Sequence, residues 1–129
     1  MEGAEQKAFV KWFRETYPDD QQCLRVSLRG LNFGSGPRAA RMINYIKSQG
    51  SVNGESDLAL LIPKGGYGAL VIEHKGDGMA RKVTKDQRSY LNYHNSVGNL
   101  ATSTRGLEEL KKAVASYMGQ TDENTLLYS

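Results

Sequence analysis

Two acids and a lysine lie on two short apolar segments, residues 57–62 and 69–75. Asp57 opens the first segment, Glu73 and Lys75 close the second, and Pro-Lys-Gly-Gly stands between them. Apolar segments around such a turn signal predict a β-hairpin. Side chains two apart on a strand share a face, so Glu73 and Lys75 point together and His74 points the other way.

The register of this hairpin decides where Asp57 lies. A turn centred on Gly65 places Asp57 opposite Glu73, and a turn centred on Gly66 places it opposite Lys75. In both cases the three side chains share one face. A turn centred between the two glycines would place Asp57 on the other face.

Two carboxylates on one sheet face repel each other unless a cation neutralises them. Oxygen ligands in this arrangement suit Mg²⁺ or Mn²⁺, which keep water ligands and also bind phosphate. A lysine beside them can orient a nucleophilic water or offset charge that develops on a phosphate. A cross-strand salt bridge between Lys75 and the two acids fits the same spacing, so the spacing leaves both interpretations open.

Glu5 is a further candidate because it lies on an apolar helical stripe with Phe9 and Trp12, four and seven residues later. A carboxylate on that stripe needs a partner, since burying it alone is costly. The alternative is that Glu5 is a solvated acid in the first helical turn, where the helix dipole favours it.

Gln87 also points inward on its predicted helix, because Leu91 and His94 share its face. It is at the same time the last residue of Thr84-Lys-Asp-Gln87, which has the pattern of a helix capping box. The pattern alone favours the cap over a role in a site.

The 129-residue chain carries a net charge of +3, with 39% hydrophobic and 24% charged residues, which is typical of a globular protein. The single cysteine excludes an intrachain disulfide and favours a reducing compartment, so we expect a cytoplasmic protein. With only two histidines, a structural zinc site of the usual type is excluded. No segment is apolar enough for a membrane span, and we expect neither a membrane partner nor an organic cofactor.

Basic side chains gather in two stretches, of which residues 21–54 hold no acid at all. Such stretches can bind a polyanion, although solvated surface charges give the same pattern. The candidate DNA-binding residues are Arg25, Arg29, Arg38 and Arg41 in the first stretch, and Arg81, Lys82, Lys85 and Arg88 in the second.

Hydrophobic periodicity predicts helices over residues 4–16, 38–49, 85–95 and 107–118, and strands over 24–29, 57–62, 69–75 and 100–103. The order α-β-α-β-β-α-β-α predicts an α/β (α+β) fold, a mixed β-sheet flanked by helices. We expect one domain over residues 1–118 and a loose tail over 119–129.

Four motifs in this order resemble those of the VRR-NUC family, the virus-type replication-repair nucleases of the PD-(D/E)XK superfamily. They are a glutamate in the first helix (Glu5), Gly54-Glu-Ser-Asp57, Glu73-His-Lys75, and a glutamine early in the next helix (Gln87). The resemblance extends from Glu5 to about Val114 and is greatest to the small stand-alone members of phages and prophages. Ser56 departs from the family, which has proline there.

The resemblance implies a restriction-endonuclease-like core and a metal-dependent DNA endonuclease in the cytoplasm of a bacterial host. It implies that Asp57, Glu73 and the backbone carbonyl of His74 bind Mg²⁺ or Mn²⁺, with Glu5 as an additional candidate ligand. Lys75 would activate the attacking water, and Glu5 and Gln87 would complete the site. It also implies a homodimer that cuts branched DNA, with Holliday junctions as the leading substrate. The alternatives are a non-catalytic nucleic-acid-binding protein on this fold, or a nuclease that reads a base sequence.

Overall fold

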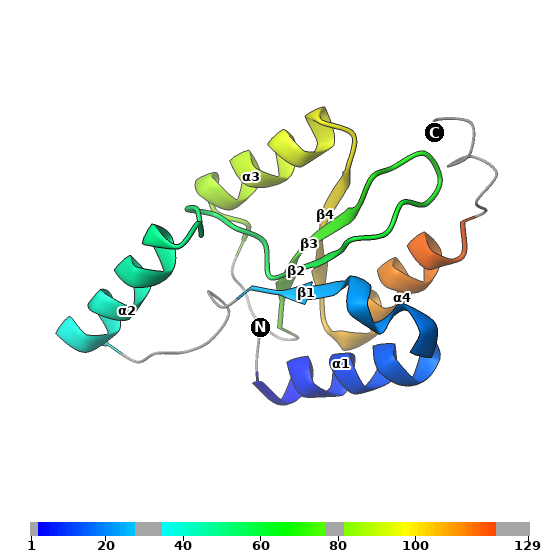
Figure 1. Ribbon diagram of the computed structural model, residues 1–129, viewed down its shortest axis with the longest axis horizontal. Coiled ribbons are helices and arrows are strands. Elements are labelled where there is room, and N and C mark those ends of the chain that lie inside the picture. Colours follow the sequence, from blue (N-terminus) through cyan, green and yellow to red (C-terminus); the bar gives the residue numbers. More distant parts are fainter. Residues whose placement is uncertain (1–2, 28–34, 77–81, 121–129) are drawn as a thin grey trace.

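A four-stranded sheet with helices on both faces forms the body of the protein (Figure 1). The computed structural model describes residues 3–27, 35–76 and 82–120. The helices are α1 (Gly3–Thr16), α2 (Pro37–Ser48), α3 (Lys85–Ser96) and α4 (Leu107–Met118), with a 3-10 helix η1 (Pro18–Cys23). The strands are β1 (Leu24–Val26), β2 (Leu58–Leu60), β3 (Leu70–Lys75) and β4 (Leu100–Arg105).

This order confirms the predicted α-β-α-β-β-α-β-α arrangement, to which η1 is an addition. Helix α1 ends at Thr16, as predicted, and Pro18 begins η1 after a non-helical Tyr17. The strands lie in the order β1-β2-β3-β4, with β1, β2 and β3 antiparallel and β3 and β4 parallel. Helix α3 makes the crossover that a parallel pair requires. Arg29 of the first predicted strand lies outside the described residues.

The β2–β3 hairpin has the register expected for a turn centred on Gly65, because Leu58 pairs with Ile72 and Leu60 with Leu70. The turn itself is centred differently. Lys64 and Tyr67 exchange two backbone hydrogen bonds of 3.1 and 2.9 Å around Gly65-Gly66, both at positive φ. Three residues, 61–63, lead into this turn and only two, 68–69, lead out. The extra residue restores the register that keeps Asp57 on the side of Glu73.

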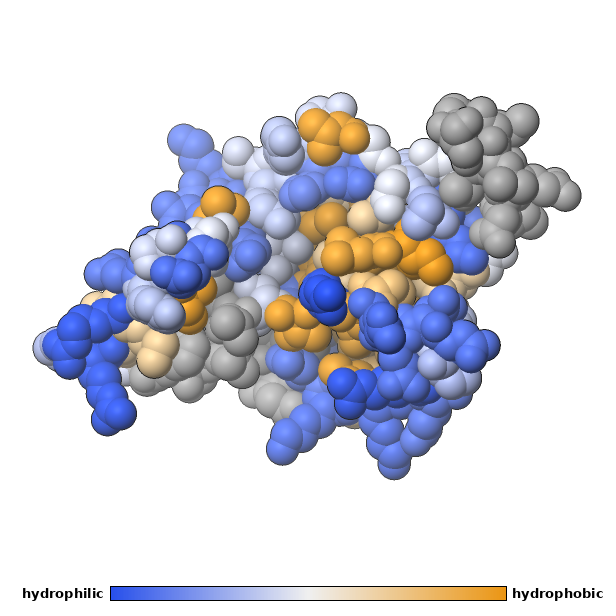
Figure 2. All heavy atoms as spheres, viewed as in Figure 1, coloured by the Kyte–Doolittle hydropathy of each residue, from blue (hydrophilic) through white to orange (hydrophobic). Residues whose placement is uncertain are grey.

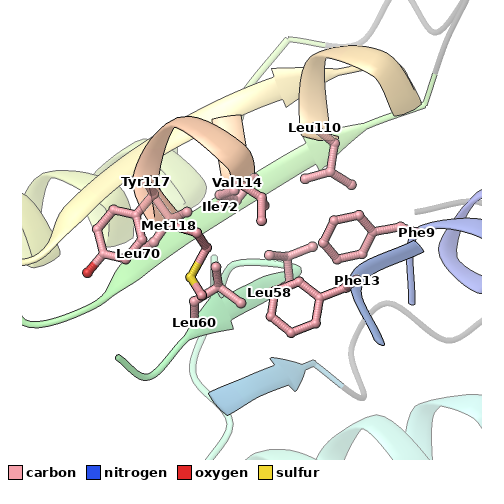
Figure 3. Close-up of a cluster of buried hydrophobic side chains, with 10 residues drawn as sticks. All are labelled: Phe9, Phe13, Leu58, Leu60, Leu70, Ile72, Leu110, Val114, Tyr117 and Met118. Atoms are coloured by element: carbon pink, nitrogen blue, oxygen red, sulfur yellow. The ribbon is translucent and has the colours of Figure 1, made fainter. Parts of the chain in front are cut away.

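One face of the sheet packs against α1 and α4 and forms the main core (Figure 3). Residues four apart on the two helices meet alternate residues of β2 and β3, so the helical and strand periodicities converge there. The core consists of Phe9 and Phe13 of α1, Leu110, Val114, Tyr117 and Met118 of α4, Leu58 and Leu60 of β2, and Leu70 and Ile72 of β3.

Helix α3 packs on the opposite face, over β3 and β4. The side chain of Asn95 at its end donates to the carbonyl of Ala101 and accepts from the Ala101 amide, at 3.1 and 2.8 Å. These bonds tie α3 to β4 beside the buried Val71. Helix α3 is therefore fixed over the strand face that carries Glu73.

Helix α2 lies at one end of the molecule and leaves part of its apolar face uncovered (Figure 1). Met42 is 44% exposed and Tyr45 62% exposed, whereas Ile43 and Ile46 are half-buried. Tyr45 and Ile46 line a cleft of about 570 Å³ with residues of β1 and with Tyr90 of α3. Packing on the protein's own sheet therefore accounts for only part of this face.

Hydrophilic side chains cover much of α1 and α2 in Figure 2, and apolar ones are exposed over β1 and the hairpin. Leu61 of the hairpin is more than half exposed. None of the helices in the described ranges is long and apolar enough to cross a membrane.

Candidate active site

Strand β3 places its polar side chains on both faces of the sheet, near its carboxyl end. Glu73 and Lys75 point toward α3, and His74 points toward α1, as the alternation predicts. Glu73 is only 3% exposed and His74 only 2%. Both therefore need partners, because a buried polar group without a hydrogen bond is costly.

Glu73, Lys75 and Gln87 form a triangle of hydrogen bonds on the α3 side. Glu73 Oε1 accepts a bond of 2.8 Å from Gln87 Nε2 and lies 3.4 Å from Lys75 Nζ. Lys75 Nζ donates in turn to Gln87 Oε1, at 3.0 Å. The amide of Gln87 thus bridges the acid and the lysine, which brings three of the expected site residues together.

Gln87 makes the helix cap as well. Its Oε1 accepts from the backbone amide of Thr84 at 2.9 Å, and Thr84 Oγ1 accepts from the Gln87 amide at 3.2 Å. The two interpretations of Gln87 are therefore compatible, because the amide oxygen serves the cap and Lys75 while the amide nitrogen serves Glu73. The capping box fixes the orientation that the site requires.

Asp57 stands directly before β2 and is held by hydrogen bonds from β3 and from the residue that follows β1. Its Oδ2 accepts from the His74 amide at 2.7 Å, and its carbonyl accepts from the Ser27 amide at 2.8 Å. The preceding Glu55 accepts from the hydroxyls of Ser27 and Ser51 at 2.7 and 2.8 Å. These hydrogen bonds hold the segment that contains Ser56.

Gly54 brings this segment against the start of α3. It has a φ of +77°, and a Cβ built on it would lie 2.1 Å from the carbonyl oxygen of Asp86 and 2.7 Å from the Gln87 amide. Only glycine permits both that conformation and that approach. The glycine of the Gly54-Glu-Ser-Asp57 motif therefore sets the distance between Asp57 and Gln87.

The surroundings of Glu73 disfavour its negative charge. Burial, together with the negative charge of Asp57, raises the pKa of Glu73 to about 7, against the lowering effect of Lys75. Among the described residues, Glu73 Oε2 is buried and has no hydrogen-bond partner. An orphaned carboxylate oxygen next to a second carboxylate fits a bound divalent metal.

The carbonyl of His74 is a third oxygen beside the two acids. The Lys75 carbonyl accepts from Gly106 at the β4 side, and successive carbonyls on a strand point to opposite edges. The His74 carbonyl therefore points to the β2 side, where the His74 amide meets Asp57. No group of three His, Cys, Asp or Glu side chains suited to a metal occurs in the described ranges. Two carboxylates and a carbonyl would leave positions for water and phosphate.

The structure does not bring Glu5 to this group of side chains. Glu5 lies in the first turn of α1, and its Oε1 is 2.5 Å from Nε2 of His74, on the other face of the sheet. The other ring nitrogen, Nδ1, is 2.7 Å from Thr104 Oγ1. Glu5 therefore has both features considered from the sequence, a first-turn position and a buried partner.

Two residues of β4 also belong to the neighbourhood of the site. The parallel register pairs Glu73 with Ser103 and Lys75 with Arg105, and paired residues share a face. The sequence predicts a strand that ends at Ser103, whereas β4 extends to Arg105. The alternation of Thr102 and Thr104 with these two residues was the signal that could have extended the strand.

The candidate DNA-binding residues within the described ranges are exposed. Two lie on α2, two at the start of α3, one on β1 and one just before α3: Arg38, Arg41, Lys85, Arg88, Arg25 and Lys82. Arg81, like Arg29, lies outside the described residues.

Comparison with known proteins gives a similarity of fold. No family model matches the chain, and no curated protein matches it. A solved structure described as a "VRR_NUC domain protein" has a similar fold, with a TM-score of 0.71 and 21% sequence identity, over 93% of each chain. This confirms, at the level of the fold, the resemblance to the VRR-NUC family that the four motifs indicated.

Proposed function

We propose that the protein is a divalent-metal-dependent endonuclease that hydrolyses phosphodiesters in branched DNA, with four-way junctions as its leading substrate. The observation that carries this proposal is the buried, unpartnered Oε2 of Glu73 beside Asp57, with Lys75 on the same face. A fold shared with a VRR_NUC domain protein supports the nuclease class.

Asp57, Glu73 and the His74 carbonyl would hold Mg²⁺ or Mn²⁺, which stabilises negative charge on a phosphate when bound. Lys75 would orient the attacking water, and the hydrogen bond from its Nζ to Gln87 Oε1 would hold the lysine side chain in place. Lys75 forms an ion pair with Glu73 Oε1 at 3.4 Å, and Gln87 donates to the same oxygen at 2.8 Å, so Oε2 is left for another ligand.

The exposed basic side chains of α2 and of the start of α3 would bind backbone phosphates on either side of the site. Such contacts provide affinity without reading the base sequence, so recognition would depend on the shape of the DNA. Arg105, paired with Lys75 across the β3–β4 ladder, is a further candidate for a phosphate contact.

A homodimer is part of the proposal because resolving a four-way junction requires two symmetric nicks, and one chain carries one candidate site. A two-fold dimer supplies two identical sites. The exposed Met42 and Tyr45 of α2 are candidates for the interface. Light scattering should give about twice the 14.3 kDa chain mass. A monomeric mass that persists on junction DNA would contradict this part of the proposal.

A cleavage assay tests the proposed activity on equimolar duplex, flap, splayed and four-way DNA with Mg²⁺ or Mn²⁺. We expect cutting near the branch of the four-way substrate, dependent on the metal. Glu109→Gln, which changes an exposed acid on α4, is the matched control for substitutions at Glu73. Binding without cleavage would favour the non-catalytic alternative, and cutting of duplex at one base sequence would favour a restriction-type nuclease.

A further inference from the structure

The imidazole of His74 has a hydrogen-bond partner at each of its two nitrogens. Its ring is fully buried, and its two nitrogens contact Glu5 of α1 and Thr104 of β4 at 2.5 and 2.7 Å. The ring lies on the core face of the sheet, opposite Glu73 and Lys75. None of the chemistry proposed above uses it.

We propose that Glu5, Thr104 and the His74 imidazole form a positioning network that sets the geometry of the metal-binding atoms from the opposite face of the sheet. This inference rests on the proposed metal-dependent function. It assigns Glu5 a role through His74, in place of direct contact with the metal.

The hydrogen-bonding chemistry fixes the orientation of the ring. A carboxylate only accepts, so Nε2 carries the proton that is donated to Glu5. The Thr104 hydroxyl can donate to Nδ1 or accept from it, so it suits the ring in either protonation state. Turning the buried ring would break both bonds and leave polar atoms unpaired, which is costly.

The same residue supplies two backbone groups to the candidate metal site. The His74 amide donates to Asp57 Oδ2 at 2.7 Å, and the carbonyl of His74 is directed to the same β2 side. The ring and these two groups share one Cα, so a ring that is held by two bonds restrains the peptide groups on both sides of it. Asp57 is thereby oriented by a residue whose side chain never reaches its face.

Each partner of the ring is itself anchored. Thr104 is 4% exposed and pairs in register with His74 across the parallel β3–β4 ladder. Glu5 is one helical turn before Phe9, which is fully buried in the core. The network therefore connects α1, β3 and β4, and it transmits the packing of the core to the metal-binding atoms.

Manganese binding to the apo protein separates a positioning role of Glu5 from a ligand role. In titration calorimetry with Mn²⁺ alone, Glu5→Ala should weaken binding by about 10- to 100-fold, as is usual for residues that orient ligands. Glu5→Gln keeps an oxygen acceptor for Nε2 and should bind Mn²⁺ within about threefold of the wild type, well inside that range. Equal losses in both variants would identify Glu5 as a direct ligand and overturn the proposal, as would wild-type binding by Glu5→Ala.

Two substitutions of Thr104 give an independent test, one that removes the hydroxyl and one that keeps it. Thr104→Val removes the hydroxyl with little change in volume and should weaken Mn²⁺ binding by about tenfold, whereas Thr104→Ser should restore it. Circular dichroism at the titration temperature confirms that each variant is folded, and the Thr104 pair decides the matter if Glu5→Ala does not fold. Unchanged affinity in Thr104→Val would contradict the network.

Asp57→Asn serves as the reference for the proposed function itself. If the wild type binds Mn²⁺ and Asp57→Asn does not, the metal site stands and the Glu5 and Thr104 variants test the network alone. If the wild type binds no Mn²⁺, or Asp57→Asn binds it equally well, the proposed metal site fails and the network loses its role.

Discussion

The two faces of β3 are both buried, yet they treat their polar groups in opposite ways. On the face toward α1 and α4, the imidazole of His74 has a partner at each nitrogen. On the face toward α3, Glu73 has a bonded Oε1 and a buried, unpartnered Oε2. Native proteins satisfy nearly all buried polar atoms, and the exceptions require an explanation.

This difference separates what stabilises the molecule from what is available to a ligand. The bonded imidazole belongs to the architecture of the core, because removing either partner leaves an unsatisfied group. The orphaned carboxylate opposes folding and remains only because the surrounding packing holds it. Local violations of the usual rules tend to occur at functional sites, which supports assigning the chemistry to the α3 face.

Among the substitutions on the α3 face, Glu73→Gln should cause the largest loss of cleavage activity. We expect cleavage to fall by more than about 100-fold, since even residues that merely orient metal ligands change activity 10- to 100-fold. DNA binding should stay equal or become tighter, because an acid near the phosphate is removed. Cleavage and gel-shift assays on one preparation measure both, and normal cutting by this variant would eliminate the proposed site.

Gly54→Ala should separate the segment of Asp57 from Gln87. The new methyl group would meet the Asp86 carbonyl at 2.1 Å, so the segment and the start of α3 must move apart. We expect a loss of about 1–3 kcal/mol in the free energy of unfolding and reduced cleavage. Gly98→Ala is the matched control, because Gly98 has a φ of +98° but open space around its Cβ position. Similar activity losses in the two variants would show that the close approach does not matter.

Glu73 on the α3 face should make the free energy of unfolding of the protein depend on pH. Its folded pKa of about 7 lies above the ordinary 4.5, so the folded state holds the proton more tightly than the unfolded state. This contribution is fully present below pH 4.5 and is lost as the pH rises through 7. Without metal, the wild type should therefore lose stability relative to Glu73→Gln between pH 5 and 8.

Urea denaturation of both proteins at pH 5 and pH 8 in a metal chelator measures that difference. Saturating Mg²⁺ at pH 8 should stabilise the wild type alone, because only it retains the charged carboxylate. A constant difference between wild type and variant across this range would contradict the assignment of the pKa shift.

The smallest effect should come from separating the two roles of Gln87. Thr84→Ala removes the capping hydroxyl and should cost about 1 kcal/mol of stability, with activity per folded molecule near wild type. Gln87→Ala should cost a similar amount and should lower activity as well, because the bridge between Glu73 and Lys75 is lost. Thermal melts and single-turnover cleavage give the two quantities. Equal activities in the two variants would reduce Gln87 to a cap.

Sequence periodicity was sufficient for the element order and for placing Glu73 and Lys75 together on one face of their strand. It also predicted that Gln87 points inward and caps its helix, but only the resemblance to the VRR-NUC family placed Gln87 with the two strand residues. The features that periodicity predicted depend on alternation and on local capping, which neighbouring residues determine. The face reached by Glu5 could not be predicted in this way. Its helical stripe points into the core, but the partner there, His74, lies 69 residues away and is brought to it only by the packing of α1 on the sheet.

The hairpin shows a second limit. The glycines indicated the turn but not its centre, and the true centre would by itself have predicted the wrong face for Asp57. The additional residue among 61–63 has no local signal, because the pairing of Leu58 and Leu60 with the core strand determines it.

Because the arms of this hairpin are unequal, one strand register determines both the position of Asp57 in the candidate site and the burial of the hairpin in the core. Losing or gaining one residue in either arm would turn Asp57 away from Glu73, and the same slip would turn Leu58 and Leu60 out of the core. A change of register that displaces Asp57 therefore always exposes Leu58 and Leu60 as well. Chains with such a register slip would therefore fail to fold, so they would be lost through instability before any effect on activity could be selected.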